Sequence, residues 1–211
     1  MRLGPICLCV VVAGVAASTG AGSRAATPGQ AVERAVLKAA EVGPGVITRQ
    51  IPHGSDVQGQ VTLDLCGFKF RSEKQRSARL QLSFIRNTGG GPFLSNEVVA
   101  YKPGWAARAM RELRTAVARC PKGFVKSSVP GAGLIKNQFD PIKSSKFLPG
   151  AVGLIDHITE QVGTKKPLRF DSLLVYQARG NVLSGVYSFG VVQLPVVVHA
   201  AEQSAINLRR L

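Results

Sequence analysis

The sequence Leu-Asp-Leu-Cys-Gly-Phe-Lys-Phe at residues 63–70 opens the segment around which the rest of the chain is arranged, and this segment ends at Cys120. Residues 78–86 alternate apolar and polar side chains, a pattern typical of a half-buried strand. After a glycine-rich loop, residues 96–101 predict a second strand. A helix then completes a strand–strand–helix unit.

This helix is predicted for residues 106–120. Its small and apolar side chains recur at steps of three and four residues, which places them on one stripe of the helix. Pro103 and Gly104 precede it, and Pro121 ends it. The stripe consists of Ala106, Ala109, Met110, Leu113, Ala116, Val117 and Cys120. It therefore directs the Cys120 sulfur toward the surface on which the helix packs.

The four cysteines divide into two pairs. Cys7 and Cys9 lie in a predicted export leader, which leaves Cys66 and Cys120 in the rest of the chain. In an exported protein a disulfide between these two is the favoured interpretation. Two buried free thiols are the alternative. A catalytic thiol has less support, because no C-x-x-C motif occurs and the histidine nearest in sequence is His53.

The N-terminus has the order of a secretory signal peptide. Arg2 is followed by an apolar run at residues 3–17 and then by small residues. This run is shorter than the roughly 20 residues of a transmembrane helix. Cleavage fits after Ala21 or Ala25, and we favour Ala25. The sequence therefore predicts a signal peptide at 1–25 and a single secreted, extracellular domain at 26–211, without a transmembrane segment.

The chain is strongly basic, with 27 Lys and Arg against 12 Asp and Glu and a net charge of +15. Without Arg2 and Arg24, which lie in the leader, the charge is +13. Such a charge favours polyanions, including nucleic acid, anionic lipid and acidic wall polymers. No nucleic-acid-binding module is recognised, so nucleic acid is not the expected partner. The candidate polyanion-binding residues are Lys69, Arg71, Lys74, Arg76 and Arg79. A solvated cationic surface is the simpler interpretation.

The remaining elements are less sharply marked. A β-hairpin at 168–178 and 182–189, followed by a helix from Pro195, repeats the order strand–strand–helix. Two such units predict an α+β fold with one antiparallel sheet and helices packed on one face. Elsewhere we expect a helix at 28–42, a strand at 46–51, an extended segment at 61–65, a short strand at 124–127, a long surface loop up to 150 and a strand at 151–162.

Motifs of known chemistry are missing from the sequence. It contains no nucleophile elbow, P-loop, H-E-x-x-H motif or dinucleotide-binding fingerprint. His53, His157 and His199 are isolated in sequence. Asp156, His157 and Glu160 could suggest a metal site, but neighbouring residues of a strand face opposite ways. We therefore expect no catalytic residues, no metal and no cofactor.

Several short segments of the sequence resemble those of a known group of proteins. These are residues 63–67, 95–99, 109–114, 120–121 and 179–183. With them the chain resembles uncharacterised exported actinobacterial proteins, which are loosely similar to the extracellular sensor domain of mycobacterial serine/threonine kinases. The resemblance implies an α+β domain that binds a ligand or partner outside the membrane. The chain departs from the kinase sensors in having one candidate disulfide rather than two, and no kinase or anchor.

The expected function is therefore an exported, non-catalytic, sensor-like domain that binds an unknown ligand or envelope component. One alternative is a cationic envelope protein held on anionic polymer by charge alone, which an even basic surface without a concave pocket would favour. Another is a secreted hydrolase whose site is assembled from distant residues, which clustered polar side chains in a deep pocket would favour.

Overall fold

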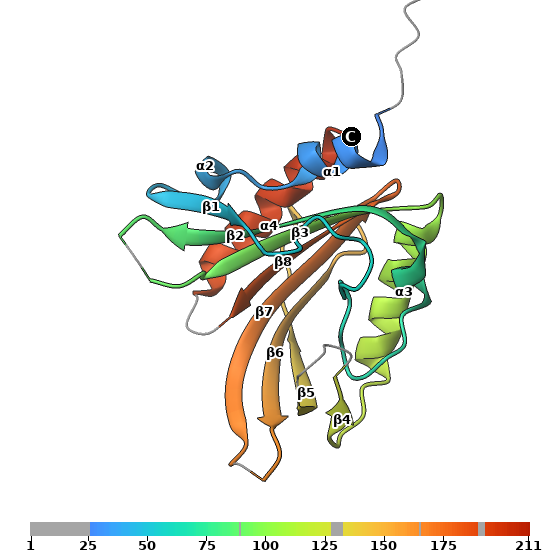
Figure 1. Ribbon diagram of the computed structural model, residues 1–211, viewed down its shortest axis with the longest axis vertical. Coiled ribbons are helices and arrows are strands. Elements are labelled where there is room, and N and C mark those ends of the chain that lie inside the picture. Colours follow the sequence, from blue (N-terminus) through green and yellow to red (C-terminus); the bar gives the residue numbers. More distant parts are fainter. Residues whose placement is uncertain (1–25, 89, 128–132, 165, 190–192) are drawn as a thin grey trace, which may run out of the picture.

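The computed structural model describes residues 26–88, 90–127, 133–164, 166–189 and 193–211 (Figure 1). Its centre is one eight-stranded sheet in the order β1-β2-β3-β8-β7-β6-β5-β4, and every neighbouring pair is antiparallel. The strands are β1 (Val46–Gln50), β2 (Arg76–Arg86), β3 (Leu94–Tyr101), β4 (Val125–Lys126), β5 (Leu134–Pro141), β6 (Val152–Gln161), β7 (Leu168–Arg179) and β8 (Val182–Phe189). The helices are α1 (Pro28–Ala35), α2 (Ala39–Val42), α3 (Trp105–Ala118) and α4 (Leu194–Arg209), with a 3₁₀ turn η1 (Arg71–Gln75). The predicted α+β class and antiparallel sheet are confirmed.

The two strand–strand–helix units meet at the middle of the sheet. β2, β3 and α3 form the first, and β7, β8 and α4 form the second. Strands β3 and β8 pair with each other and thereby join the units, with Glu97 opposite Gly185. The β7–β8 turn is tight, and Gly180 adopts a positive φ of 55° there, which suits glycine.

The helices cover both faces of the sheet, so the prediction that they pack on one face is wrong. Leu174 and Tyr176 of β7 lie in the same apolar cluster as the buried side of α3. Their neighbours Leu173 and Val175 lie in a second cluster with α4, on the opposite face. In Figure 1, α3 stands on one side of the sheet and α1 and α4 on the other. A strand that is apolar on both faces must be covered on both.

Helix α3 has the predicted stripe. Ala106, Ala109, Met110, Leu113 and Ala116 are buried against the sheet. Beyond the helix, Cys120 forms the predicted disulfide with Cys66, with their Cα atoms 5.3 Å apart. The bond ties the end of α3 to the segment that precedes η1, and Leu63 and Leu65 of that segment are buried in the same cluster.

Three local predictions need correction. The expected loop up to residue 150 contains β5, and the expected extended segment at 61–65 is irregular. The expected helix 28–42 is two helices, α1 and α2. The break lets the amide of the buried Leu37 donate a hydrogen bond of 2.8 Å to Asn96 Oδ1 in the middle of the sheet.

The predicted signal peptide, including Cys7 and Cys9, lies outside the described residues and stays a prediction. Among the helices of the described part, none is long and apolar enough to cross a membrane.

Candidate functional site

Two hollows lie on the side of the sheet that faces α3. The first, here the basic pocket, has a volume of about 750 Å³. The second, here the acidic cleft, has a volume of about 440 Å³ and lies against β5, β6 and β7. Val61 and Ser127 line both, so they form a shared wall. The basic pocket is lined chiefly by Phe68, Lys69, Phe70, Glu73, Lys74, Arg76 and Lys126. The acidic cleft is lined chiefly by Asp64, Glu97, Ile135, Asn137, Asp156, Ile158, Glu160, Phe170, Tyr176 and Tyr187.

The basic pocket is lined by exposed lysines and by two phenylalanine rings. Lys69, Lys74 and Lys126 are exposed at its edge. The rings of Phe68 and Phe70 meet edge to face with their centroids 5.0 Å apart. This arrangement brings three of the sequence-predicted cations, Lys69, Lys74 and Arg76, to one hollow. The exposed Arg71 lies close in sequence, in η1.

Arg76 and Arg79, two of the predicted polyanion-binding residues, have buried side chains that bind other parts of the protein. The Arg76 side chain is only 5% exposed and donates to the Gln60 carbonyl at 2.6 Å and to Thr62 Oγ1 at 2.9 Å. Arg79 is 3% exposed and pairs with Glu97. Successive side chains of β2 point to opposite faces of the sheet, and Arg79 points to the face covered by the irregular segment 53–62. There it also donates hydrogen bonds to backbone carbonyls of that segment. Both guanidinium groups therefore hold the wall of the site in place.

Glu97 is the most heavily used carboxylate of the site. It is 2% exposed and accepts hydrogen bonds from Arg79, from Thr62 Oγ1 at 2.7 Å and from the Tyr187 hydroxyl at 2.9 Å. Burial, and then the Glu97 charge, raise the pKa of Tyr187 well above its usual value, so this hydroxyl keeps its proton and donates. A Cβ at Gly185 would clash with the Tyr187 ring, so the glycine opposite Glu97 leaves room for this contact.

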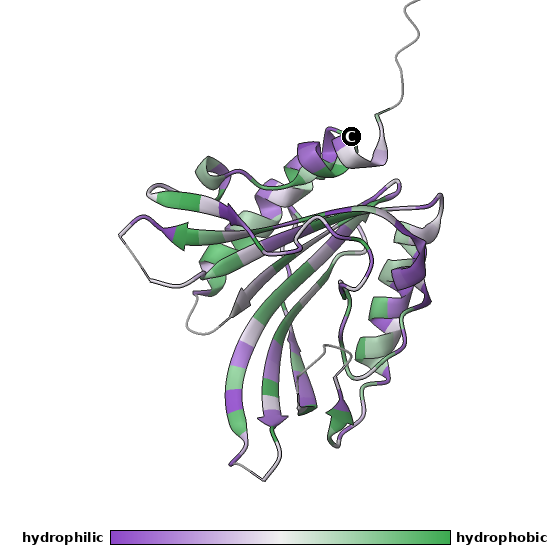
Figure 2. Ribbon diagram, in the orientation of Figure 1, coloured by the Kyte–Doolittle hydropathy of each residue, from purple (hydrophilic) through white to green (hydrophobic). Residues whose placement is uncertain are grey.

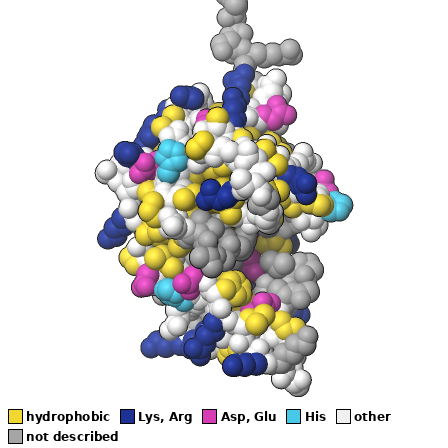
Figure 3. Space-filling model, turned by 90° about the vertical axis from the view of Figure 1, so that its left-hand side faces the viewer, with side chains coloured by type: hydrophobic (Ala, Val, Ile, Leu, Met, Phe, Trp, Pro, Cys, Tyr) yellow, Lys and Arg dark blue, Asp and Glu magenta, His cyan; other side chains and the backbone are white. Residues whose placement is uncertain are grey.

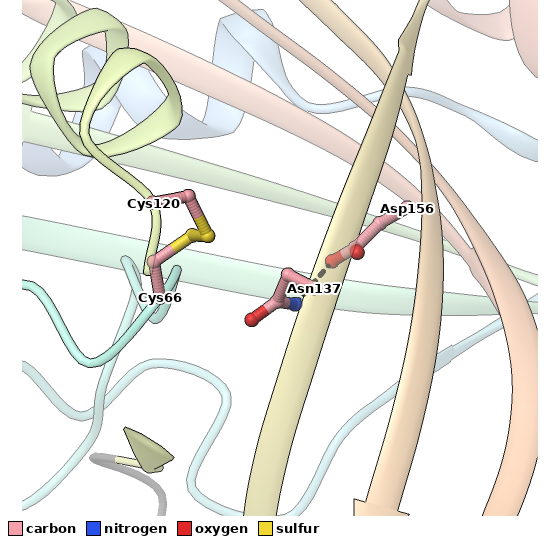
Figure 4. The surroundings of a disulfide bond; sticks show 4 residues. All are labelled: Cys66, Cys120, Asn137 and Asp156. Carbon is pink, nitrogen blue, oxygen red and sulfur yellow. Dashed lines mark hydrogen bonds between the residues drawn. A yellow bond between two sulfur atoms is a disulfide. The ribbon is translucent and has the colours of Figure 1, made fainter. Parts of the chain in front are cut away.

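The floor of the acidic cleft holds a polar pair that sequence reasoning missed. Asn137 of β5 and Asp156 of β6 are 7% and 1% exposed, and Asn137 Nδ2 donates to Asp156 Oδ2 at 2.8 Å. Figure 4 shows the two side chains pointing from neighbouring strands toward the same side as the Cys66–Cys120 bond. Within the described part of the chain, Asn137 Oδ1 and Asp156 Oδ1 have no hydrogen-bond partner.

Burial raises the pKa of Asp156 to about 7, and the hydrogen bond from Asn137 lowers it only in part. The free energy of unfolding should therefore fall as the pH rises from about 4 to 7. In this window the folded chain holds a proton that the unfolded chain, with an ordinary Asp pKa of 3.8, has lost. Urea denaturation across this pH range should show the free energy of unfolding declining with pH. In the Asp156→Asn variant this decline should be shallower.

The matched control is Glu33→Gln, which removes an exposed acid of α1 and should leave the slope unchanged. Carbon-detected NMR of the carboxyl groups measures the titration directly. A midpoint near pH 4 for Asp156 would contradict this account.

His157 lies on the outer face of the sheet, opposite to Asp156, as expected for neighbours in a strand. Its Nδ1 lies 2.8 Å from Asp171 Oδ1 and its Nε2 lies 3.1 Å from Asp140 Oδ2. These hydrogen bonds, first that of Asp171, raise the pKa of the exposed imidazole. Over the described ranges, no three His, Cys, Asp or Glu side chains converge closely enough to hold a metal ion.

The fold is a single antiparallel sheet with helices on both faces. A similar solved structure is the crystal structure of the extracellular domain of PknH from Mycobacterium tuberculosis, with a TM-score of 0.55 and 14% sequence identity. The match covers 85% of this chain and 95% of that one. It confirms the expected resemblance to an extracellular sensor domain at the level of the fold. No known protein family and no curated protein matches the sequence.

Proposed function

We propose that the chain is an exported, non-catalytic, sensor-like domain that binds an anionic ligand or envelope component in the basic pocket. The observation that carries this proposal is a hollow of about 750 Å³ edged by Lys69, Lys74 and Lys126 over two phenylalanine rings. Lysine ammonium groups pair with phosphate and carboxylate groups, and the rings offer apolar contact to the rest of the ligand.

Three further observations support an extracellular role. The fold resembles that of an extracellular domain. The Cys66–Cys120 disulfide suits an oxidising compartment. The net charge of +13 on residues 26–211 would attract anionic surfaces. Secretion itself rests on the predicted leader.

The rival function is a cationic envelope protein held by charge alone. Figure 3 shows Lys and Arg side chains gathered at the lower end of the molecule, where the ends of β5, β6 and β7 lie, as well as elsewhere on this face. Charge spread in this way supports some binding to any anionic polymer. The concave basic pocket favours the leading proposal, because a pocket adds contacts that depend on the shape of the ligand.

Binding to polyphosphate and to phosphatidylglycerol vesicles should separate the two functions. The pocket variant Lys69→Gln/Lys74→Gln should lose about tenfold in affinity at 0.15 M salt, because two contacts of a few tenths to 1 kcal/mol each disappear. The control Lys102→Gln/Lys143→Gln removes the same charge at exposed positions outside the pocket and should lose twofold or less.

A second arm of the experiment repeats the measurement at 0.5 M salt, where the screening length is about 4 Å. Binding that persists there in the wild type but not in the pocket variant supports a specific ligand. Equal losses in both double variants, together with no binding at 0.5 M salt, would leave charge alone as the function.

A further inference from the structure

The acidic cleft has the opposite charge to the protein that contains it. Four carboxylates line it, and the described lining residues include no lysine or arginine. The whole chain carries +15. The four acids are Asp64, Glu97, Asp156 and Glu160. A hollow of this kind in a basic protein selects against the anions that the rest of the surface attracts.

Three of these acids already have donors within the protein. Glu97 is neutralised by the buried Arg79. Asp64 accepts a hydrogen bond of 2.5 Å from Ser127 Oγ, and Glu160 Oε1 accepts one of 3.2 Å from the Gly133 amide. Asp156 also accepts a hydrogen bond, from Asn137 at Oδ2, but its Oδ1 is buried without a partner among the described residues.

Among the described residues that line the cleft, the buried side-chain atoms without a partner are both oxygens. Asn137 Oδ1 is an acceptor, and so is Asp156 Oδ1 when Asp156 is ionised; both residues are more than nine-tenths buried and line the same cleft. A buried polar atom without a partner costs free energy that a ligand can recover by supplying the partner. A group that fits acceptors of this kind, one of them on a carboxyl group, is a donor with a positive charge.

Apolar side chains continue the cleft beyond this polar floor. Ile158 and Phe170 line it, and Phe170 is 37% exposed. Leu168 lies two residues before Phe170 on the same side of β7 and is 61% exposed. Figure 2 shows hydrophobic and hydrophilic residues alternating along this lower half of β7. Because successive side chains of a strand point to opposite faces, its polar residues face away from the apolar ones.

We infer that the acidic cleft is a second binding site, which takes an amphiphilic amine. The protonated amino group lies against Asn137 and Asp156, and the apolar part of the ligand lies along Ile158 and Phe170. This site is separate from the basic pocket and takes a ligand of opposite charge. Burial raises the pKa of Asp156 to about 7, so an ammonium group placed beside it also restores its ionised form.

Titration of the ¹⁵N-labelled protein with n-hexylammonium tests the inference, with hexanoate and n-hexanol as probes of equal length. Hexylammonium should shift the amide signals of β5, β6 and β7 around Asn137, Asp156 and Phe170, with a Kd of about 1 mM for so small a ligand. Hexanoate should bind at least tenfold more weakly because its carboxylate meets the carboxylates of the cleft. Hexanol should lie between them.

Two variants locate the charge. Asp156→Asn and Glu160→Gln each remove one carboxylate of the cleft, and Asp156→Asn should weaken hexylammonium binding about tenfold, the value of a hydrogen bond to a charged group. Asp140→Asn, an exposed residue on the outer face of β5, should leave the affinity unchanged. The pocket variant Lys69→Gln/Lys74→Gln should also leave it unchanged, so the outcome does not depend on the basic pocket.

The inference is overturned if hexanoate or hexanol binds as tightly as hexylammonium, because the cleft would then select apolar length or neutral donors rather than positive charge. It is equally overturned if the shifts lie outside the cleft. If Asp156→Asn does not fold, the Glu160→Gln variant and the comparison of the three probes on the wild type still test the proposal. The proposal would be contradicted if Glu160→Gln bound hexylammonium with unchanged affinity and the three probes bound the wild type equally well.

Discussion

Replacing Glu97 with alanine should lower the free energy of unfolding by about 3–5 kcal/mol, the usual cost of removing one partner from a buried ion pair. Arg79 would then be left charged and 3% exposed without its carboxylate. Thr62 and Tyr187 would each lose an acceptor at the same time. Chemical denaturation of the variant and of the wild type measures the difference.

The double variant Arg79→Met/Glu97→Leu tests whether the cost comes from the orphaned charge. It removes both partners and should be less destabilised than Glu97→Ala, because an apolar pair can replace a buried ion pair at little cost. The surface control Glu33→Ala should change stability by about 0.5 kcal/mol or less. A loss below 1 kcal/mol in Glu97→Ala would show that the pair is solvated and the network unimportant.

Loss of the disulfide should have an effect of similar size. The bond closes a loop of 54 residues, and the chain-entropy relation gives about 4 kcal/mol for the double variant Cys66→Ser/Cys120→Ser. The segment with Leu63 and Leu65 would then be held to α3 only by packing. Urea denaturation of the chain without residues 1–25, with and without reductant, checks this value.

Thiol labelling provides an independent control. The unreduced, denatured wild type without its leader should show no reactive thiol, and the reduced protein should show two. Reduction of the wild type should reproduce the stability of the double serine variant. Two reactive thiols per chain before reduction would contradict the disulfide.

The elements that the sequence predicted are those with an unbroken period. Helix α3 has apolar residues at steps of three and four over its whole length, and the β7–β8 hairpin has a glycine at its turn. Strand β5 was missed because Asn137 takes an inward position that an apolar residue would normally occupy. The coverage of both faces could have been inferred from Leu173–Tyr176, four apolar residues in a row on one strand.

The site was predictable only where residues close in sequence meet. Lys69 and Lys74 lie five positions apart and reach one pocket. Arg79 looks like another exposed cation in the sequence, because the carboxylate that neutralises it lies 18 positions away on another strand. The pair of Asn137 and Asp156 spans 19 positions and depends on the register of β5 and β6. The residues next to Asn137 in the sequence do not indicate that it contacts Asp156, and the residues next to Asp156 do not indicate it either.

The two hollows share a wall through which binding in one could act on the other. Val61 and Ser127 line both the basic pocket and the acidic cleft, and the segment that carries Val61 is tied to α3 through Cys66. Any displacement of this wall by a ligand in one hollow changes the free energy of binding in the other, and the effect is reciprocal. If both proposed ligands bind, this wall would link them, so that an anion in the basic pocket would change the affinity for an amine in the acidic cleft, and the reverse.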